Sequence, residues 1–449
     1  MAESFRGAET GERGPMPTVP ASESAAAPRS VLTAAKGFRS ESQIRTGLYL
    51  ERLSVGFALG SFLLLPLYFR SVGRNEVFFG EVYAAGALGT LLSVSLGAAA
   101  IKRFGLQRIA PVGSSFFAFG SALYAFAAYT TAPLYVFFLA SFLQGVGWGQ
   151  VFANGPICLS TTLGNLPESR KYRDASYYFA TYAAFSQLGV GLGPFTMRIL
   201  VGTFHWGYVT VFALGTATAV AAAVLALLTS SRNTLYSSVQ SGGASSLRDF
   251  WLVLKQPSIY FFATIFLAGC IYTSMMNLQT TFAAAQGLDY GVFYTFYTFA
   301  VVFSRFALSR PISKLSPPTS MIGLLALMTA ALASFFWADK SAVLYAIASL
   351  LLGGTYGLAY PVMQGQLTKY SHDDLIAPTM MYFSLSYFIA VYLFPYVTAT
   401  FATRYGYSVM PVILTCAGAM ELLVAVYFFR VVAMSPTIQA KSPKWVAGS

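Results

Sequence analysis

The sequence predicts an all-α polytopic membrane protein, with twelve transmembrane helices arranged as two pseudo-symmetric six-helix bundles. Twelve apolar stretches are each about the length of a membrane span, since a bilayer core takes roughly 20 helical residues to cross. Hydrophobic residues make up 56% of the chain and charged residues only 10%, which is far from the balance of a soluble domain. A polar interval in the middle of the chain separates six spans from six.

The predicted elements follow this hydropathy pattern along the chain. The spans of the first half begin near Gly47, Val77, Ile109, Pro133, Asp174 and Trp206, and those of the second half near Ser258, Tyr290, Thr319, Ser341, Leu375 and Ser408. The corresponding segments are a disordered cytoplasmic tail (1–46), an N-terminal bundle (47–228), a cytoplasmic linker (229–257), a C-terminal bundle (258–433) and a cytoplasmic tail (434–449). The tail composition, rich in small and polar residues, cannot bury enough surface to fold. Within the linker, 246–255 predicts a short helix on the membrane surface.

Basic residues indicate the orientation of these spans. With the N-terminus inside, twenty-one Lys and Arg residues fall in inner segments and five on the opposite side, as expected when positively charged loops stay cytoplasmic. Both termini are therefore predicted to be cytoplasmic. The net charge of +12 is explained by this topology and by anionic lipid headgroups, so nucleic-acid binding is not expected.

The two halves share a local pattern. Gly145 to Gly149 in the fourth span is followed by an aromatic residue at the same spacing as Gly353 to Gly357 in the tenth. Internal repeats of this kind are how secondary transporters build two rocking halves around a central site. Tight packing of small-residue helix faces is the alternative explanation.

Three motifs carry a family resemblance. Residues 102–105 with Arg108 stand where the major facilitator superfamily has Asp-Arg-x-Gly and basic residues, but the aspartate is missing. Residues 141–147 look like its Arg-x-x-Gln-Gly-x-Gly motif with Ser141 in place of the arginine, and 189–194 resemble the Gly-x-x-x-Gly-Pro signature of its twelve-span efflux, or antiporter, branch. The resemblance extends from Gly47 to Val432 and implies the family's fold and transport by alternating access.

The resemblance also implies a central cavity, lined by spans one, two, four, five, seven, eight, ten and eleven. The substrate-binding candidates near mid-depth are Trp148, Gln187, Tyr272, Met276, Asn277, Tyr297, Tyr356 and Tyr387. Such an aromatic, mostly neutral lining suits amphipathic or aromatic molecules, although each residue alone is more often a packing aromatic. Arg305 in span eight is either the partner of an anionic substrate or a side chain that snorkels to the headgroups, and the sequence slightly favours snorkelling.

Ionisable residues within spans are expensive and are functional candidates by default. Glu81 shares a helix face with Gly89 and Ser93, so it is predicted to point into the protein as a proton carrier, with an interhelical hydrogen bond as the alternative. Glu421 is the second proton-coupling candidate. The resemblance places it in a peripheral span, which favours a structural role.

Loop charges predict a cytoplasmic latch of reversed polarity. Lys102 and Arg103 would face Asp373 and Asp374, and in the other half the gate candidates are Arg310, Lys314, Glu168 and Asp174. Solvated loop charges of little energetic value are the alternative. Gly189, Gly193 and Pro194 in span five predict a gating hinge or, equally, a close helix crossing.

Enzymatic chemistry finds little support in the sequence. Its two histidines lie in loops on opposite sides, and no phosphate-binding loop or metal-spaced cluster is present, so no cofactor or metal is expected. The predicted function is secondary active transport of a small organic molecule, with proton-coupled export as the main hypothesis. The alternatives are an importer or facilitator of an organic anion and a non-transporting assembly or receptor protein. A monomer in a bacterial inner membrane is expected.

Overall fold

The computed structural model describes residues 29–130, 132–163, 168–232, 247–371 and 375–432. The chain divides into two compact units, residues 1–43 and 44–449. The contacts described below lie within the second unit. Residues 1–28 and 434–449 of the predicted tails and residues 233–246 of the predicted linker lie outside the described residues. Residues 29–46, predicted as part of the disordered N-terminal tail, belong instead to a helix that begins at Arg29 and continues into the first span. The described segment from Leu247 to Leu254 is helical, as predicted.

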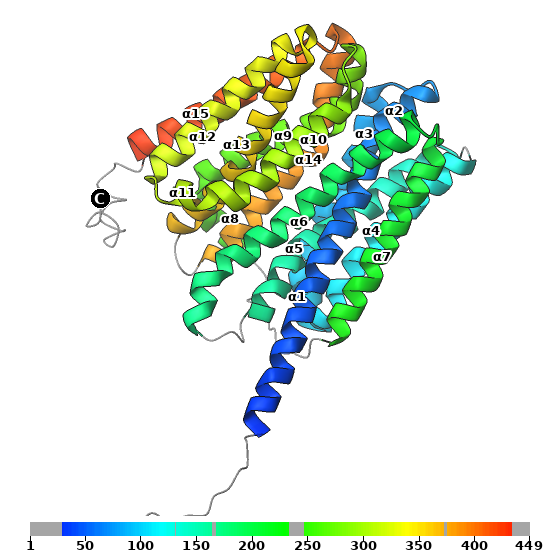
Figure 1. Cartoon of the computed structure of the whole chain (residues 1–449). Coiled ribbons are helices and arrows are strands. Elements are labelled where there is room, and N and C mark those ends of the chain that lie inside the picture. Colours follow the sequence, from blue (N-terminus) through cyan, green and yellow to red (C-terminus); the bar gives the residue numbers. More distant parts are fainter. Residues whose placement is uncertain (1–28, 131, 164–167, 233–246, 372–374, 433–449) are drawn as a thin grey trace, which may run out of the picture. The chain divides into compact units, whose positions relative to one another are not determined.

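The first half of the chain forms eight helical elements and one short 3-10 turn (Figure 1). They are α1 (Arg29–Ser61), η1 (Phe62–Leu64), α2 (Leu65–Ser71), α3 (Glu76–Phe104), α4 (Leu106–Thr130), α5 (Tyr135–Leu163), α6 (Glu168–Gly202), α7 (Tyr208–Arg232) and α8 (Leu247–Leu254). Local chemistry sets several of these bounds. The Asn75 side chain caps α3 by accepting from the Phe78 amide at 3.1 Å, and Gly105 ends it with a positive φ of 80°.

The second half repeats this pattern of long helices. Its elements are α9 (Ile259–Ala285), α10 (Tyr290–Phe303), η3 (Ser304–Leu308), α11 (Ser309–Ser313), α12 (Pro317–Ser334), η4 (Phe335–Lys340), α13 (Ala342–Lys369), α14 (Ile376–Tyr405), α15 (Val409–Tyr427) and η6 (Phe428–Val432). Ser316 and Asp289 cap α12 and α10 through their side chains. The predicted all-helical architecture is confirmed.

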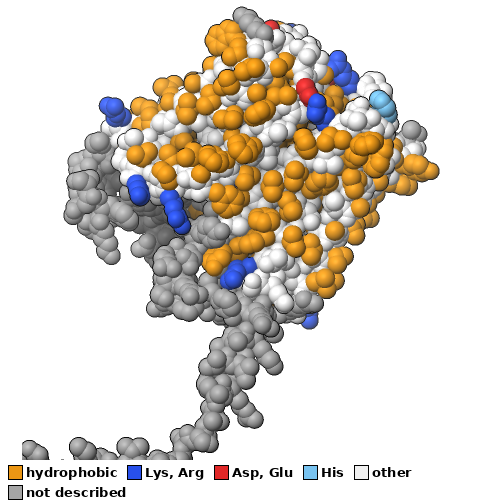
Figure 2. Space-filling view, in the orientation of Figure 1, with side chains coloured by type: hydrophobic (Ala, Val, Ile, Leu, Met, Phe, Trp, Pro, Cys, Tyr) orange, Lys and Arg blue, Asp and Glu red, His pale blue; other side chains and the backbone are white. Residues whose placement is uncertain are grey.

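Eleven helices among the described residues are long and apolar enough to cross a membrane. The helix α6, which covers the predicted fifth span, is 35 residues long. Hydrophobic side chains are spread over the visible face in Figure 2, with charged side chains few and scattered. This surface is what a bilayer requires, so the chain is an integral, multi-pass membrane protein.

The glycine pattern shared by the two halves has the same packing role in both. A Cβ on Gly145 of α5 would lie 2.1 Å from the Gly86 carbonyl oxygen of α3. A Cβ on Gly353 of α13 would lie 2.3 Å from the Tyr297 carbonyl oxygen of α10. Glycine is therefore needed at both crossings, because any side chain would collide with a neighbouring backbone.

Contacts between the two bundles concentrate toward one end of the helices. We call the end with the connections 72–75, 203–207 and 286–289 the far end, and the end with Gly105 and Ser316 the linker end. A Cβ on Gly80 of α3 would meet Tyr396 Cα of α14 at 2.5 Å, and one on Gly191 of α6 would meet Thr298 Oγ1 of α10. These positions lie in the far portions of their helices, so the bundles meet at the far end.

Candidate functional site

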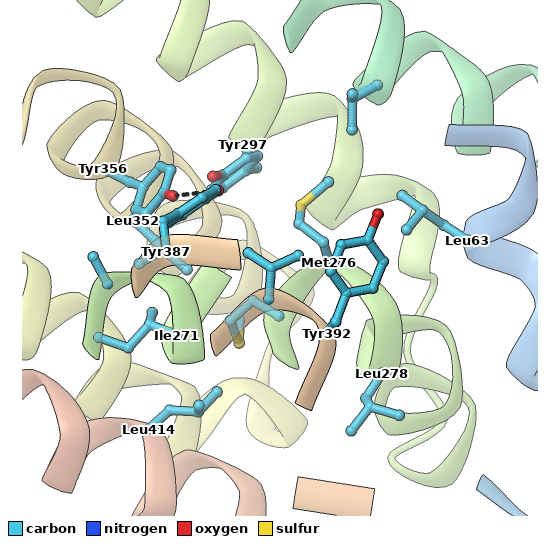
Figure 3. Packing of buried hydrophobic residues seen from close by; sticks show 14 of the residues in the cluster. Leu63, Ile271, Met276, Leu278, Tyr297, Leu352, Tyr356, Tyr387, Tyr392 and Leu414 are labelled. Atoms are coloured by element: carbon cyan, nitrogen blue, oxygen red, sulfur yellow. Dashed lines mark hydrogen bonds between the residues drawn. The ribbon is translucent and has the colours of Figure 1, made fainter. Parts of the chain in front are cut away.

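Five tyrosines from the C-terminal bundle form the centre of the candidate site. This tyrosine cluster consists of Tyr272 of α9, Tyr297 of α10, Tyr356 and Tyr360 of α13, and Tyr387 of α14. The rings of Tyr272 and Tyr356 stack with centroids 5.2 Å apart, and Tyr360 meets Tyr387 edge-on at 5.8 Å. Figure 3 shows Tyr297, Tyr356 and Tyr387 gathered around a 3.1 Å hydrogen bond between the Tyr356 and Tyr387 hydroxyls.

Arg305 lies against this cluster and not at the membrane surface. Its side chain is buried, with 7% of the residue exposed, and its Nε donates to the Gly357 carbonyl oxygen at 3.1 Å. Its positive charge acts on the hydroxyls of four of the five tyrosines. The predicted snorkelling of Arg305 is therefore wrong, because the side chain is turned inward between α10 and α13.

The backbone around Arg305 is irregular. Residues Ser304–Leu308 form a π-helical turn between α10 and α11. Such turns are rare within α-helices and frequently mark functional sites. Here the extra residue in the turn changes the rotation of the helix, which directs Arg305 toward α13 while Phe303 and Phe306 remain exposed.

The N-terminal bundle closes one side of the cluster. The Gln187 side chain of α6 lies close to the Tyr272 hydroxyl across the interface. Trp148 of α5 packs against Phe117 and Phe152, and Phe152 in turn meets Phe388 of α14 edge-on at 4.9 Å. Trp148 is thus connected to the cluster through phenylalanines and does not contact a tyrosine ring directly.

Met276 and Asn277 are placed differently from the other predicted residues. Met276 is buried in the hydrophobic core, and its carbonyl oxygen accepts from the Tyr294 hydroxyl at 2.5 Å. The Asn277 amide donates to the Thr273 carbonyl at 2.9 Å in its own helix. It also lies close to the Tyr83 hydroxyl of α3. Met276 therefore connects α9 to α10, and Asn277 lies where α9 approaches α3.

Sequence reasoning missed three residues here. Tyr360, Phe152 and Phe388 all take part in the contacts described above. Tyr360 follows Tyr356 by four residues, a spacing that places two side chains on one helix face, and Phe152 follows Trp148 by the same spacing. That signal was available, whereas only the packing of α14 against α5 shows the role of Phe388.

A second buried polar group lies in the N-terminal bundle. Arg52 of α1 donates to the Tyr182 hydroxyl and to the Val151 carbonyl, and its guanidinium lies over the Tyr182 ring. The adjacent Glu51 accepts from Ser114 of α4 at 2.6 Å. A small cavity next to Glu51 is lined by residues of α1, α4, α5 and α7. These side chains satisfy one another, so the group cross-links four helices.

The two proton-coupling candidates have opposite environments. Glu81 is exposed on the same side of α3 as Leu88, so the prediction that it points into the protein is wrong. Its helix turns Gly89 and Ser93 inward instead. Glu421 is fully buried, and neither of its carboxyl oxygens has a hydrogen-bond partner in the described ranges of the chain.

An ion pair joins the bundles at the far end. Arg198 of α6 pairs with Asp289, which also caps α10 by accepting from the Gly291 amide at 2.8 Å. Both side chains are about 40% exposed, with values of 42% and 37%. The gate predicted from the sequence does not include this pair.

The predicted latch residues are mostly beyond what the structure describes. Asp373 and Asp374 lie outside the described residues, as do the side chains of Lys102, Glu168 and Asp174. Arg103 packs over Phe104, and Arg310 and Lys314 are exposed. The latch therefore stays a prediction.

Gly189 and Gly193 of α6 form a close crossing with α1. A Cβ on Gly189 would lie 2.2 Å from the Leu53 carbonyl oxygen, and one on Gly193 would lie 2.6 Å from Gly60. Pro194 packs beside Gly60 at the same crossing. The packing interpretation of these residues thus has direct structural support.

Comparisons with known proteins agree with this architecture. The Major Facilitator Superfamily profile matches residues 53–395, while a search of curated proteins gives no match. Among solved structures, the nucleoside transporter NupG has a TM-score of 0.67 at 12% identity and covers 87% of this chain and 99% of its own.

Two further solved structures are similarly related. The human organic anion transporter MFSD10 has a TM-score of 0.62 at 14% identity and covers 86% of this chain and 99% of its own. A mutant of the peptide transporter POT has a TM-score of 0.66 at 14% identity and covers 89% of this chain and 95% of its own. Identities this low establish the shared fold alone. With three quarters of its length matched by the family profile and this fold, the chain is a transporter and not an enzyme, and it belongs to the major facilitator superfamily.

Proposed function

We propose that this protein transports a small organic anion that carries an aromatic ring, and that Arg305 binds the anionic group. The observation that supports this most strongly is the buried guanidinium beside the tyrosine cluster. Among the described residues no carboxylate pairs with Arg305, whose side chain donates one hydrogen bond, to the Gly357 carbonyl oxygen. A buried arginine that keeps donor groups available is suited to two-pronged recognition of a carboxylate or phosphate.

The aromatic part of the proposal rests on the cluster itself. Tyr272, Tyr360, Trp148 and Gln187 are each partly exposed, whereas Tyr297, Tyr356 and Tyr387 are buried. The partly exposed side chains offer ring faces and hydrogen-bonding groups, the usual combination in small-molecule sites.

Alternating access supplies the transport step. The bundles meet at the far end, which favours access to the cluster from the linker end in this conformation. If the linker end is cytoplasmic, as the distribution of basic residues predicts, this is the inward-facing state. Proton-coupled export remains the expected direction from the antiporter-type motif at 189–194, and the experiment below tests direction and coupling together.

The test uses proteoliposomes with defined orientation and a panel of aromatic carboxylates, each paired with its neutral amide. We expect transport of carboxylates over amides, with a gradient of protons changing the rate. Arg305→Gln should weaken carboxylate affinity by about 10- to 150-fold, because a hydrogen bond to a charged group is worth about 1.5–3 kcal/mol. Arg305→Lys should fall between, since lysine keeps the charge without the planar fork.

Arg404→Gln, a change at an exposed arginine of α14, is the matched control and should transport normally. If folded Arg305→Gln protein keeps wild-type carboxylate affinity, Arg305 is not the anion partner. If the wild type transports no member of the panel and instead retains a stable partner protein on purification, the assembly or receptor hypothesis gains support.

A further inference from the structure

The C-terminal bundle contains a fully buried carboxyl group away from the tyrosine cluster. Glu421 lies in the middle of α15, where it has no exposed surface. Neither oxygen has a hydrogen-bond partner among the residues that the structure describes, although buried polar groups in proteins are nearly always paired. The helix α15 packs against α9 and α12. The presence of an unpaired carboxyl group within this packing needs an explanation.

Within the described part of the chain, no positively charged side chain pairs with Glu421. The helices α9, α12 and α15 contain no other Asp, Glu, Lys, Arg or His. The helix α14 also contacts α15, and α13 contacts α9 and α12. Both carry their charged residues only at their ends, at Arg404 and Lys369. The Cys270 thiol of α9 is close enough to interact electrostatically with the Glu421 carboxyl group. An ionised carboxylate here would have neither a counter-ion nor a donor, which is very costly.

A second unsatisfied polar group lies along the same interface. Gln279 of α9 is fully buried, and its amide nitrogen donates to the Tyr345 hydroxyl at 2.7 Å. Its Oε1 has no partner. Gln279 lines a small cavity between α9, α12, η4 and α15, together with Leu414 and Met410. This cavity lies between Glu421 and the far end, since Met410 is in the first turn of α15.

The α15 residues between the cavity and Glu421 are small, and Thr329 and Leu332 of α12 pack against Gly418 at this point. Leu414 precedes Glu421 by seven residues, which is two turns or about 10 Å, and places both on one face of the helix. Between them this face carries Ala417 and Gly418. Water entering the cavity from the far end would meet the Gln279 carbonyl there, and the Thr329 hydroxyl beside Gly418 lies between that cavity and the Glu421 carboxyl.

We propose that Glu421 is a proton-binding site, held as a neutral carboxylic acid in this conformation and exchanging its proton with the far end past Gln279. The bound ligand is a proton, because a single carboxyl group with no other convergent oxygen ligands cannot satisfy a metal cation. The site is independent of Arg305 and of the substrate proposal, so it stands even if the transported molecule is not an anion.

Infrared difference spectroscopy of the purified, folded protein tests the protonation. The wild type and the matched control Glu81→Gln, which alters an exposed glutamate, should both show the carbonyl stretch of a neutral carboxylic acid near neutral pH. Glu421→Gln, which preserves the shape of the neutral acid, should lack that band. If the band is unchanged in Glu421→Gln, or absent from the wild type, Glu421 is not a neutral acid and the proposal fails.

A hydrophobic carbodiimide, dicyclohexylcarbodiimide, provides a second readout. The carboxyl proton moves to one carbodiimide nitrogen, the carboxylate oxygen adds to the central carbon, and an acyl shift to nitrogen gives a stable N-acylurea that retains the whole reagent. Mass spectrometry should find this adduct on the peptide with Glu421, and not in Glu421→Gln. Transfer of the protein into D2O tests the exchange path past Gln279, because exchange of the carboxyl proton for deuterium shifts the acid band. Gln279→Leu should slow this shift several-fold relative to the wild type. An unchanged rate of the shift would overturn the path.

Discussion

At the scale of single residues, burial decides the roles of the charged side chains. Arg305 and Arg52 are both buried arginines in spans, yet their surroundings differ. Arg52 is used by the protein itself, through Tyr182 and the Val151 carbonyl. Arg305 has one backbone acceptor and otherwise faces tyrosines, which leaves it available for a ligand.

Arg52→Ala should destabilise the protein without a specific effect on substrate selectivity. The change leaves the Val151 carbonyl and the Tyr182 hydroxyl unsatisfied, at about 1–3 kcal/mol each. We expect a clear fall in the thermal unfolding temperature in detergent. Arg70→Ala, at an exposed arginine in the last turn of α2, should leave the unfolding temperature unchanged, and equal losses in both variants would refute the assigned role.

The hydroxyl pair of Tyr356 and Tyr387 should act as a unit in substrate binding. Removing one hydroxyl by Tyr356→Phe or Tyr387→Phe costs about 0.5–1.5 kcal/mol, so each single variant should weaken substrate affinity by about 2- to 10-fold. The double variant should be no weaker than the worse single. Strictly additive losses in a binding titration would show that the two hydroxyls act separately.

At the scale of helices, close backbone crossings organise each bundle. The crossings of α5 with α3 and of α13 with α10 place glycine against backbone at matching positions. The crossing of α6 with α1 uses Gly189 and Gly193 against Gly56 and Gly60. Small residues let helices approach closely where lipid supplies no hydrophobic driving force between them.

Neighbouring glycines in α13 allow a matched test of this packing. Gly353→Ala should destabilise the protein and disturb transport, because its Cβ would lie 2.3 Å from the Tyr297 carbonyl oxygen. Gly354→Ala should be tolerated or slightly stabilising, since nothing lies within 4 Å of its Cβ and alanine favours a helix by up to about 1 kcal/mol. The measurement is the thermal unfolding temperature of each variant. Similar unfolding temperatures for the two variants would contradict the close crossing of α13 with α10 at Gly353.

At the scale of the whole molecule, the two bundles touch at the far end. The packing of α3 with α14 and of α6 with α10 lies there, and the ion pair of Arg198 and Asp289 crosses the same interface. Because that pair is partly exposed, it contributes modestly to closure. It adds to apolar contacts such as that between Gly80 and Tyr396.

Breaking the ion pair should shift the molecule toward opening at the far end. Arg198→Ala loses about 0.2–1 kcal/mol of closure, which corresponds to about a 1.4- to 5-fold change in the open population. Electron-spin distance measurements between labels at Thr203→Cys and Thr403→Cys, with Cys416 replaced by serine, would report it. The swap Arg198→Asp with Asp289→Arg should restore the wild-type distribution, and a swap that behaves like the single variant would exclude this pairing.

The sequence by itself determined the membrane class, the helical fold and the family, because hydropathy and glycine motifs are local properties that each span carries alone. It also placed tyrosines of four separate helices in one site. Only the tertiary structure decided that Arg305 turns inward, that Glu81 faces outward while Glu421 is enclosed, and that Arg198 meets Asp289. These outcomes depend on the rotation of each helix about its axis and on which helices cross it. A single π-helical turn or one close crossing changes that rotation without any clear mark in the hydropathy pattern.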